Sequence, residues 1–299
     1  MNKIAAWLNA ARLRTLPLSV SGIVIGSALG RFYGKSDSLI FIIALLTTIG
    51  FQVTSNFAND YGDGVKGTDN LDRIGPKRAL QSGLLTRSEL KNGILISIVF
   101  CVILVLTLLY ISFGSDQIEY FILFGVLGSL SIWAAIKYTV GTSAYGYRGL
   151  GDIFVFIFFG LLAVLGSLFL YTKFISVFAW LPAITIGALS TAVLNLNNLR
   201  DYESDKMAGK NTLIVKMGWN NGKKYHYALV AIAFLSMLTF IVLNFEVWYQ
   251  FIPLLAFIPI GAHVFKVTKT KSPRLLDPEL KKLALSTFLM SFLFYITFI

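Results

Sequence analysis

Charged residues are scarce in this chain of 299 residues. Asp, Glu, Lys and Arg make up 14% of it, against about 25% in soluble domains. Hydrophobic residues make up 56%, and they are spread along the whole length. This composition is typical of a helical membrane protein and excludes an ordinary soluble enzyme. Because no Pro- or Ser-rich linker divides the chain, we expect a single domain over residues 1–299.

Cysteine and histidine are almost absent. The single cysteine, Cys101, lies in an apolar run and has no partner for an internal disulfide. The two histidines, His226 and His263, match no metal-ligand spacing, so we expect them to be polar residues at the membrane interface. The sequence also has no patch of interleaved basic and aromatic residues, and we therefore expect no nucleic-acid partner.

Long apolar runs are the main feature of the chain. A membrane-spanning helix requires about 20 mostly apolar residues. Nine segments meet this requirement, and we predict spans at about 16–33, 38–58, 92–113, 120–136, 150–171, 177–199, 225–244, 250–266 and 283–299. The predicted fold class is therefore all-α: a polytopic membrane bundle of nine transmembrane helices in the lipid bilayer.

The segment before the first span, MNKIAAWLNAARLR, predicts an amphipathic helix on the membrane surface. Its apolar residues fall on one helical face: Ile4, Trp7, Leu8 and Ala11. Its charge comes from three basic residues: Lys3, Arg12 and Arg14.

The basic residues are distributed unequally between the two sides of the nine-span bundle. Of the 26 Lys and Arg residues, 23 fall on the side of the N-terminus. Only Arg31, Lys35 and Lys173 fall on the other side. Basic loops remain in the cytoplasm, so we predict a multi-pass protein of the cytoplasmic membrane with its N-terminus inside.

Acidic residues gather in two places on this cytoplasmic side. The first is NFANDYGDGVKGTD at 56–69, which follows the second span directly. Asn56 and Asp60 are four residues apart. Asn59 and Asp63 have the same spacing, so each pair shares a helical face if the second helix continues this far.

The second acidic place is NLNNLRDYESDKMAGKNT at 195–212, after the sixth span. Asn197, Asp201 and Asp205 recur every four residues and predict one polar stripe. Carboxylates stacked at a membrane edge repel each other and are poorly solvated, which favours a bound cation between them. Hard carboxylate and amide oxygens suit Mg²⁺, which also shares its coordination with phosphate oxygens.

Basic residues accompany both acidic clusters. Five of them flank the same region: Arg73, Lys77, Arg78, Arg200 and Lys210. Carboxylates and cations together match a metal-bridged polyphosphate better than a bare metal ion. The alternative interpretation is a solvated acidic loop with helix caps and lysines that only set the topology.

These two clusters resemble the aspartate-rich motifs of the UbiA superfamily of intramembrane aromatic prenyltransferases. The first family motif is matched by Asn59, Asp60 and Asp63, and Asp69 follows two residues beyond the usual place of the third aspartate. The second motif, D-x-x-x-D-x-x-x-G-K-x-T, is matched over residues 201–212. The resemblance implies nine transmembrane helices, with the motifs on the loops after the second and sixth.

Four blocks in order resemble the branch of the superfamily that acts on 1,4-dihydroxy-2-naphthoate: ARLRTLPLSVSGIVIGSA, NDYGDGVKGTDNLDRIGP, YGYRGLGDIFVFIFFG and NNLRDYESDKMAGKNTLIVKMG. The resemblance implies transfer of a polyprenyl group from a polyprenyl diphosphate to this aromatic hydroxy acid. Diphosphate and CO₂ would be lost, giving a demethylmenaquinone. Relatives with another acceptor, 4-hydroxybenzoate or homogentisate, remain the alternative. An ion-coupled transporter is a weaker alternative, because transporter carboxylates favour the bilayer midplane rather than helix ends.

Further candidates lie outside the two motifs. Arg148 is a candidate for contacting diphosphate or the acceptor carboxylate, and Asp152 begins the fifth span facing the same side. Arg14 is a candidate for the acceptor carboxylate. Trp133 and Lys137 have the spacing of the family's Tyr-x-x-x-Lys motif.

The predicted site comprises three sets of residues. The metal ligands are predicted to be Asn59, Asp60, Asp63, Asp69, Asp201 and Asp205. The substrate-binding residues are predicted to be Asn56, Arg73, Lys77, Arg78, Asn197, Arg200, Lys210, Arg14 and Lys137. The catalytic residues are predicted to be Asp63, Asp201, Asp205, Arg148 and Asp152.

Overall fold

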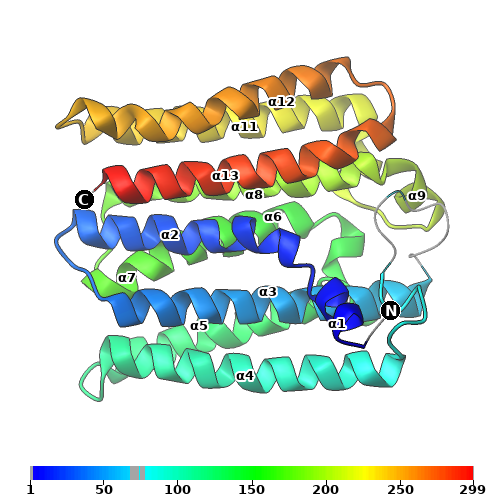
Figure 1. The fold of residues 1–299 in the computed structure, drawn as a ribbon, viewed down its shortest axis with the longest axis horizontal. Coiled ribbons are helices and arrows are strands. Elements are labelled where there is room, and N and C mark those ends of the chain that lie inside the picture. The colour runs from blue at the N-terminus through cyan, green and yellow to red at the C-terminus, as the bar shows by residue number, and fades with distance from the viewer. Residues whose placement is uncertain (1–2, 68–73, 75–77, 299) are drawn as a thin grey trace.

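The computed structural model describes residues 3–67, 74 and 78–298, and the regular structure in this part is helical throughout (Figure 1). Nine helical segments within the described residues are long and apolar enough to cross a membrane. They occupy Lys3–Phe32, Ser38–Lys66, Arg87–Phe113, Ile118–Lys137, Gly151–Thr172, Val177–Arg200, Trp219–Leu243, Trp248–Lys269 and Pro273–Thr297. Each overlaps one predicted span, so the predicted all-α membrane bundle is confirmed.

Several spans consist of more than one helical element. The first half of the chain contains α1 (Lys3–Ala11), η1 (Leu13–Thr15), α2 (Leu16–Phe32), α3 (Ser38–Lys66), α4 (Arg87–Phe113), α5 (Ile118–Lys137), η2 (Tyr145–Arg148) and α6 (Gly151–Val155). The second half contains η3 (Phe156–Gly166), α7 (Ser167–Thr172), η4 (Val177–Ala179), α8 (Trp180–Arg200), α9 (Tyr202–Met207), α10 (Leu213–Met217), α11 (Trp219–Leu243), η5 (Trp248–Ala256), α12 (Phe257–Lys269), η6 (Pro273–Leu276) and α13 (Asp277–Thr297). Of these, η3 is a π-helix.

Local sequence signals set the helix boundaries. The Asp37 carboxylate accepts hydrogen bonds from the backbone N–H groups of Leu39 and Ile40 at the start of α3. Gly67 ends α3 in the left-handed conformation, with φ of 71°. Thr86 and Glu89 form a capping box that starts α4 several residues before the predicted span. α3 and α4 thus extend beyond their apolar runs, α3 to a glycine at its end and α4 from a capping box at its start.

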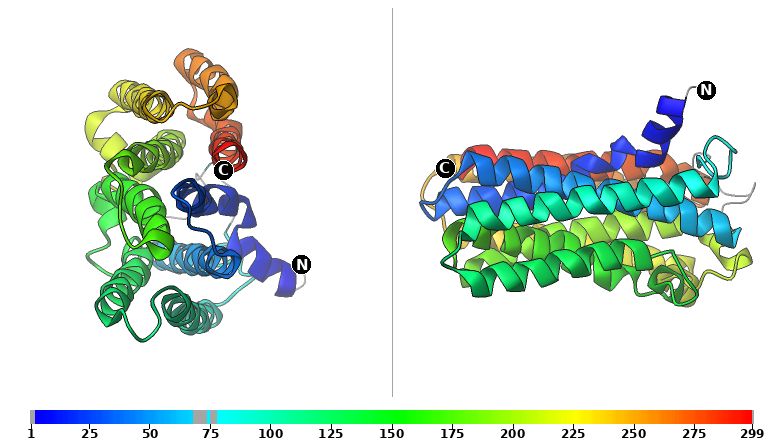
Figure 2. Two further views of the ribbon diagram at one scale, coloured as in Figure 1. Left: turned by 90° about the vertical axis from the view of Figure 1, so that its left-hand side faces the viewer. Right: turned by 90° about the horizontal axis from the view of Figure 1, so that it is seen from below.

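The helices of the bundle pack at close range where small residues face each other. α8 packs against α11, η3 and α13, and α2 packs against α13 and η3 (Figures 1 and 2). A Cβ atom added at Gly160 of η3 would lie 2.4 Å from the Cα atom of Gly187 in α8. A Cβ atom added at Gly26 would lie 2.5 Å from the Val164 carbonyl oxygen. Glycine is required at these crossings because the backbones touch.

Both acidic clusters lie at the same end of the bundle, beside α1 and α9 (Figure 1). α3 continues to Lys66, so the first motif is helical up to Asp63, as its spacing predicted. The second motif is not one continuous helix. α8 ends at Arg200, the chain bends at Asp201, and Asp205 belongs to the separate short helix α9.

The N-terminal helix α1 is helical as predicted, but the predicted apolar face is divided between two environments. Ile4 and Leu8 are exposed, in keeping with a position at the membrane surface. Trp7 instead packs edge-on against Phe57 of α3, with ring centroids 5.2 Å apart, and Ala11 is buried. α1 is therefore docked on the bundle through part of the face that was expected to contact lipid.

We expect the end with both acidic clusters to face the cytoplasm, because 23 of the 26 basic residues fall on that side. Cysteines introduced at Ser88 and Asn221, both exposed, should react with a membrane-impermeant maleimide only from the cytoplasmic face of a Cys101→Ala background. A cysteine at exposed Ser36, in the loop between α2 and α3, is the control and should react only from outside. Outside labelling at Ser88 or Asn221 would contradict the orientation.

Candidate active site

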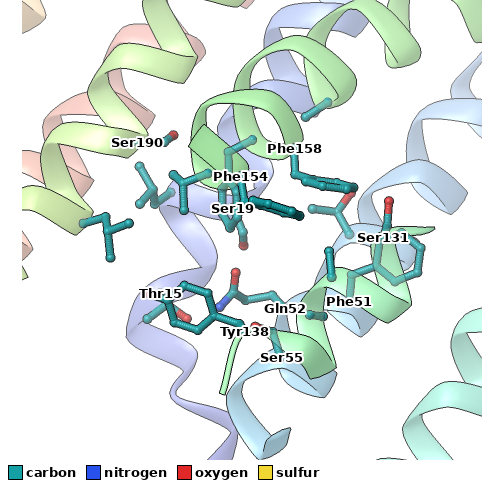
Figure 3. A pocket seen from close by; sticks show the side chains of 18 of the residues that line it. Thr15, Ser19, Phe51, Gln52, Ser55, Ser131, Tyr138, Phe154, Phe158 and Ser190 are labelled. Carbon is teal, nitrogen blue, oxygen red and sulfur yellow. The ribbon is translucent and has the colours of Figure 1, made fainter. Parts of the chain in front are cut away.

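A cavity of about 690 Å³ runs down the inside of the bundle from the end that carries the acidic clusters. Its polar end is lined by Asn59, Asp63, Arg78, Asn197, Arg200, Lys210 and Asp277. Deeper in the bundle its walls are mostly apolar and include Ala44, Leu109, Phe124, Phe158 and Leu162. Between the two regions Ser19, Gln52, Ser131 and Tyr138 point toward the same space (Figure 3). The cavity therefore joins a charged head to a long apolar body.

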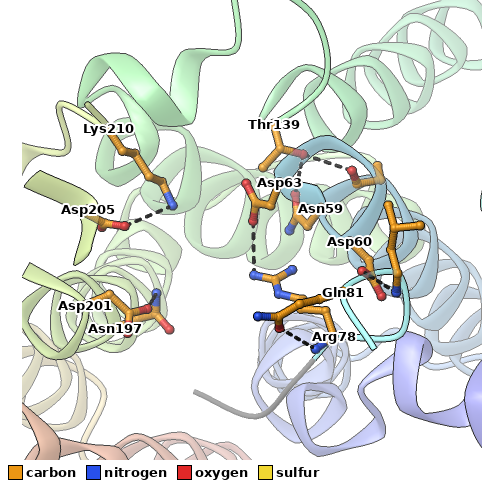
Figure 4. Close-up of polar contacts among 12 residues, drawn as sticks. Asn59, Asp60, Asp63, Arg78, Gln81, Thr139, Asn197, Asp201, Asp205 and Lys210 are labelled. Atoms are coloured by element: carbon orange, nitrogen blue, oxygen red, sulfur yellow. Dashed lines mark hydrogen bonds and ion pairs between the residues drawn. The ribbon is translucent and has the colours of Figure 1, made fainter. Parts of the chain in front are cut away.

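Asp63, on the last turns of α3, is held by two partners at the polar end. Arg78 forms an ion pair with its carboxylate at 3.1 Å (Figure 4). The Tyr147 hydroxyl donates a hydrogen bond to the other carboxylate oxygen at 2.7 Å. The side chain of Asp63 is 6% exposed, so these contacts replace water around a buried charge.

Arg200, the last residue of α8, organises the second cluster. Its Nε and one terminal nitrogen bind both oxygens of Asp201, at 2.8 and 2.6 Å. The same terminal nitrogen donates to the Asn197 side chain at 2.9 Å, and the other donates to Asp277 of α13 at 2.7 Å. This planar fork is a geometry that lysine cannot reproduce.

Lys210 lies between the two clusters. Its Nζ is 3.7 Å from an Asp205 carboxylate oxygen and 5.3 Å from the centroid of the Tyr147 ring. Burial alone would lower the pKa of Lys210, but the carboxylates of Asp63 and Asp205 outweigh it and hold this pKa above its ordinary value. Lys210 is therefore a permanent cation that faces both motifs (Figure 4).

Asp60 and Asn56 have other partners than those predicted. The Asp60 carboxylate accepts hydrogen bonds from the backbone N–H groups of Ala79 and Leu80 at 3.1 and 3.3 Å. The Asn56 amide donates to the Ala11 carbonyl at 2.8 Å. Neither side chain lines the cavity. These residues lie on a neighbouring face of α3, where they fix the following loop and the N-terminal segment. A spacing of four residues shows that two side chains share a face, but not which face meets the site.

The structure places the four candidates outside the motifs differently with respect to the cavity. Arg14 lines the cavity, but Lys137 and Arg148 do not, and the Arg148 side chain is exposed. Arg148 instead offers its backbone carbonyl to Lys216 at 2.6 Å. Asp152 is buried beside the cavity wall and does not line it. The predicted site residues Asp69, Arg73 and Lys77 lie outside the described residues.

Two members of the site were missed by the sequence reasoning. Tyr147, which contacts Asp63 and Lys210, directly precedes Arg148 in the block YGYRGLGD. Only Arg148 and Asp152 of this block were predicted to belong to the site. Asp277 lies 77 residues from its partner Arg200 and opens α13 next to a proline at the N1 or N2 position. Asp-Pro is typical of a helix start, and only packing shows that this aspartate contacts the site.

The fit of the site to a divalent metal can be judged from its donor groups. Carboxylate and amide oxygens of Asp63, Asp201, Asp205, Asn59 and Asn197 are of the type that Mg²⁺ prefers. Within the described part of the chain, however, no three acidic, His or Cys side chains are grouped closely enough to hold a metal by themselves. This arrangement fits a metal that takes one or two carboxylates and completes its coordination with phosphate oxygens and water.

Comparisons with known proteins agree on one family. A model described as the UbiA prenyltransferase family matches residues 19–293. The 1,4-dihydroxy-2-naphthoate octaprenyltransferase of Haemophilus influenzae is 42% identical, covering 98% of this chain and 95% of its own length. The protein of the same name from Escherichia coli is 40% identical with the same coverage.

Solved structures of the same family share the fold. The structure of a UbiA homolog from Archaeoglobus fulgidus bound to GPP and Mg²⁺ has a TM-score of 0.68, with 15% identity over 97% of this chain and 99% of that one. The same homolog bound to Cd²⁺ has a TM-score of 0.61, with 16% identity and the same coverage.

The contacts of Arg200 predict a strong effect on stability. Replacing it by methionine leaves Asp201 buried without its bidentate partner, so Arg200→Met should lower the free energy of unfolding by about 3–5 kcal/mol. Asp277→Asn is the control: Asp277 is 42% exposed, and its loss should cost under about 1 kcal/mol. Unfolding by SDS in detergent micelles measures both. Equal effects of the two substitutions would contradict this account of the ion pair.

Proposed function

The chain belongs to the UbiA prenyltransferase family, and on this premise we propose that it transfers a polyprenyl group from a polyprenyl diphosphate to 1,4-dihydroxy-2-naphthoate. The C1–O bond of the allylic diphosphate breaks, and a bond forms between C1 and a ring carbon of the acceptor. Diphosphate leaves from C1, the carboxyl group leaves the ring as CO₂ with its electron pair returned to the ring, and the product is the quinol form of a demethylmenaquinone. The observation that carries the proposal is the cavity, whose charged end continues into an apolar body inside a membrane bundle.

The charged end is suited to the diphosphate. Arg78, Arg200 and Lys210 supply three cations that line the cavity, and phosphate oxygens accept charge-assisted hydrogen bonds from such groups. Asp63, Asp201 and Asp205 would hold Mg²⁺ together with the diphosphate. A metal held there would supply positive charge against the charge that develops on the leaving oxygen. The preorganised cations act on the same charge, which is where electrostatic stabilisation lowers a barrier most effectively.

The apolar body is suited to the isoprenoid tail. Along α3 the cavity extends from Asp63 to Ala44. At 1.5 Å of rise per residue this corresponds to roughly 28 Å, close to the thickness of the bilayer core of about 30 Å. A substrate whose head is a diphosphate and whose tail partitions into lipid requires this combination, and it explains why the enzyme spans the membrane.

Aromatic side chains lie between the two regions, where the allylic carbon would be placed. Tyr138 and Phe154 line the cavity there (Figure 3). Tyr145 stacks on Phe154 with ring centroids 3.9 Å apart. Burial raises the pKa of Tyr138, so its ring stays a neutral phenol with an electron-rich face. Ring faces of this kind stabilise a developing carbocation while the surrounding apolar wall excludes water.

We assign the acceptor subsite to the part of the cavity between the charged end and the apolar body. The polar groups of Ser19, Gln52 and Ser131 line it, and they can bind the ring hydroxyls of a dihydroxynaphthoate. Arg14 lines the cavity from the N-terminal segment and is our candidate for the ring carboxylate. Of the three basic residues considered from the sequence, it alone reaches the cavity wall in the described structure, so Lys137 and Arg148 are withdrawn from this role.

The metal role of the three aspartates predicts large losses of rate. Asp63→Asn, Asp201→Asn and Asp205→Asn should each lower kcat at saturating Mg²⁺ at least about 100-fold, equivalent to about 2.7 kcal/mol of transition-state stabilisation. EDTA should abolish release of diphosphate, and Mg²⁺ should restore it. Asp60→Asn is the matched control, because Asp60 contacts backbone amides rather than the cavity. It should lower the unfolding temperature while changing kcat little. Near-normal turnover of all three site variants would reject the metal assignment.

The acceptor assignment predicts a specific product and a selective binding defect. Dihydroxynaphthoate labelled in its carboxyl group should release all of its label as CO₂. Arg14→Gln should raise the acceptor KM about 10- to 100-fold and leave the prenyl diphosphate KM within about twofold, because one ligand loses a charge-assisted contact.

Two substitutions control for the loss of a positive charge near the site. Lys137→Gln and Arg148→Gln should change neither KM, since neither side chain lines the cavity. A prenylated product that keeps the carboxyl label would contradict the decarboxylating reaction. Better turnover with 4-hydroxybenzoate would reject the acceptor while the family assignment stands.

A further inference from the structure

His226 of α11 and His263 of α12 are fully buried and face each other, with their Nε2 atoms 2.9 Å apart. They were expected to be polar residues at the membrane interface, and the structure shows that their side chains lie between helices rather than on the surface. Two imidazole nitrogens at this distance require one proton between them, because one nitrogen must donate and the other accept. The proton arrangement follows from the partners at both ends of the pair.

The α8 end of this line is fixed by Asn195, which is fully buried. Its amide nitrogen donates to the Gly222 carbonyl at 3.3 Å, which orients the side chain. Its amide oxygen then faces His226 Nδ1 at 3.1 Å and can only accept. The Ala192 carbonyl is a second acceptor for the same ring. His226 therefore carries a proton on Nδ1.

The other end is Glu279 of α13, whose Oε2 lies 2.8 Å from His263 Nδ1. The line thus contains three hydrogen bonds in series, from Asn195 to His226, from His226 to His263 and from His263 to Glu279. Each needs one proton, and the Asn195 oxygen supplies none. Two neutral imidazoles carry two protons, so the histidines and Glu279 together must hold a third.

Glu279 is the charged end of this line. It is 3% exposed, and a buried carboxylate needs compensating partners. Lys266 approaches its Oε1 at 3.0 Å and Lys282 its Oε2 at 3.9 Å, while His263 bonds it from the other side. With the third proton, the line of His226, His263 and Glu279 itself carries no net charge, and the two lysines remain outside it.

This line is connected to the active site through the first turn of α13. Asp277 and Glu279 are two positions apart, which directs them to different sides of the helix. Asp277 binds Arg200 of α8 at 2.7 Å, and Glu279 binds His263 of α12 at 2.8 Å. Pro278 and Lys281, from the same stretch, line the cavity. The turn is thus held from both sides.

We propose that the hydrogen-bonded line Asn195–His226–His263–Glu279, with its retained proton, positions the first turn of α13 so that Asp277 orients Arg200 toward the diphosphate. Glu279, His263 and His226 are positioning residues in this account, and none of them touches substrate. The role in diphosphate binding rests on the proposed function, whereas the proton arrangement does not.

The proton arrangement can be measured by ¹⁵N NMR of the unaltered protein, labelled at histidine, in lipid bilayers. His226 should carry a proton on Nδ1, and His263 should be either cationic or protonated on Nε2. Both observations leave three protons on the line. A neutral His263 protonated on Nδ1, together with a neutral His226 protonated on Nε2, would overturn the inference. This test requires no variant and no substrate.

The positioning role can be measured as binding of geranyl diphosphate with Mg²⁺, which is independent of the aromatic acceptor. Glu279→Ala breaks the line and should raise the Kd about tenfold, the size expected when a group supporting a ligand-binding residue is lost. Glu279→Gln should keep the Kd within about twofold, because its amide N–H donates to His263 and completes three hydrogen bonds with two neutral rings.

Thr287→Val is the matched control for packing on α13, since the hydroxyl of buried Thr287 donates to the Leu283 carbonyl of its own helix. It should bind geranyl diphosphate as the unaltered protein does. A Kd for Glu279→Ala equal to that of Thr287→Val would overturn the positioning role, and so would equal weakening by Ala and Gln. If the unaltered protein bound no geranyl diphosphate, the proposed function and the positioning role would both fall. If it bound and prenylated a different acceptor, only the acceptor would be wrong.

Discussion

The pairing of buried charges at the membrane edge is the constraint on which the site depends. A carboxylate buried here needs a cation or hydrogen-bond donors beside it, because water is scarce and the surrounding helices are apolar. Asp63 lines the cavity and pairs with Arg78, whereas Asp201 and Asp205 lie just behind its wall and pair with the lining residues Arg200 and Lys210. A diphosphate with its metal brings both signs of charge at once. It can therefore enter such a site by exchanging partners rather than by leaving any charge unpaired.

The same constraint explains the division of the cavity into two regions. The charged residues that line the cavity come from helix ends and from the segments that join the helices, and the walls deeper in the bundle are mostly apolar. Close helix crossings at Gly160 and Gly187 bring η3 and α8 together without polar side chains. The bundle can thus keep an apolar tunnel next to a charged head, which a mixed distribution of polar residues would prevent.

The sequence specified those features that depend on local spacing. Apolar runs predicted the helices, and residues four apart predicted that Asn59 and Asp63 share a face of α3. Spacing could not show that Asp60 contacts the backbone of Ala79 and Leu80, because that depends on how the following loop folds back. Nor could spacing show that Arg148, at the end of a short 3₁₀ turn, has an exposed side chain.

Long-range contacts were the features least accessible to sequence reasoning. His226 and His263 are 37 residues apart and match no motif, so only helix packing reveals that they bond each other. Asp277 and Glu279 belong to a segment that carried no recognisable block. In the structure Asp277 of this segment binds Arg200, and Glu279 ends the buried line of hydrogen bonds at His263. A helix turn held between α8 and α12 cannot shift at one side without strain at the other. The residues that orient the site therefore extend into the last helices, well beyond the two aspartate motifs that bind the diphosphate in our proposal.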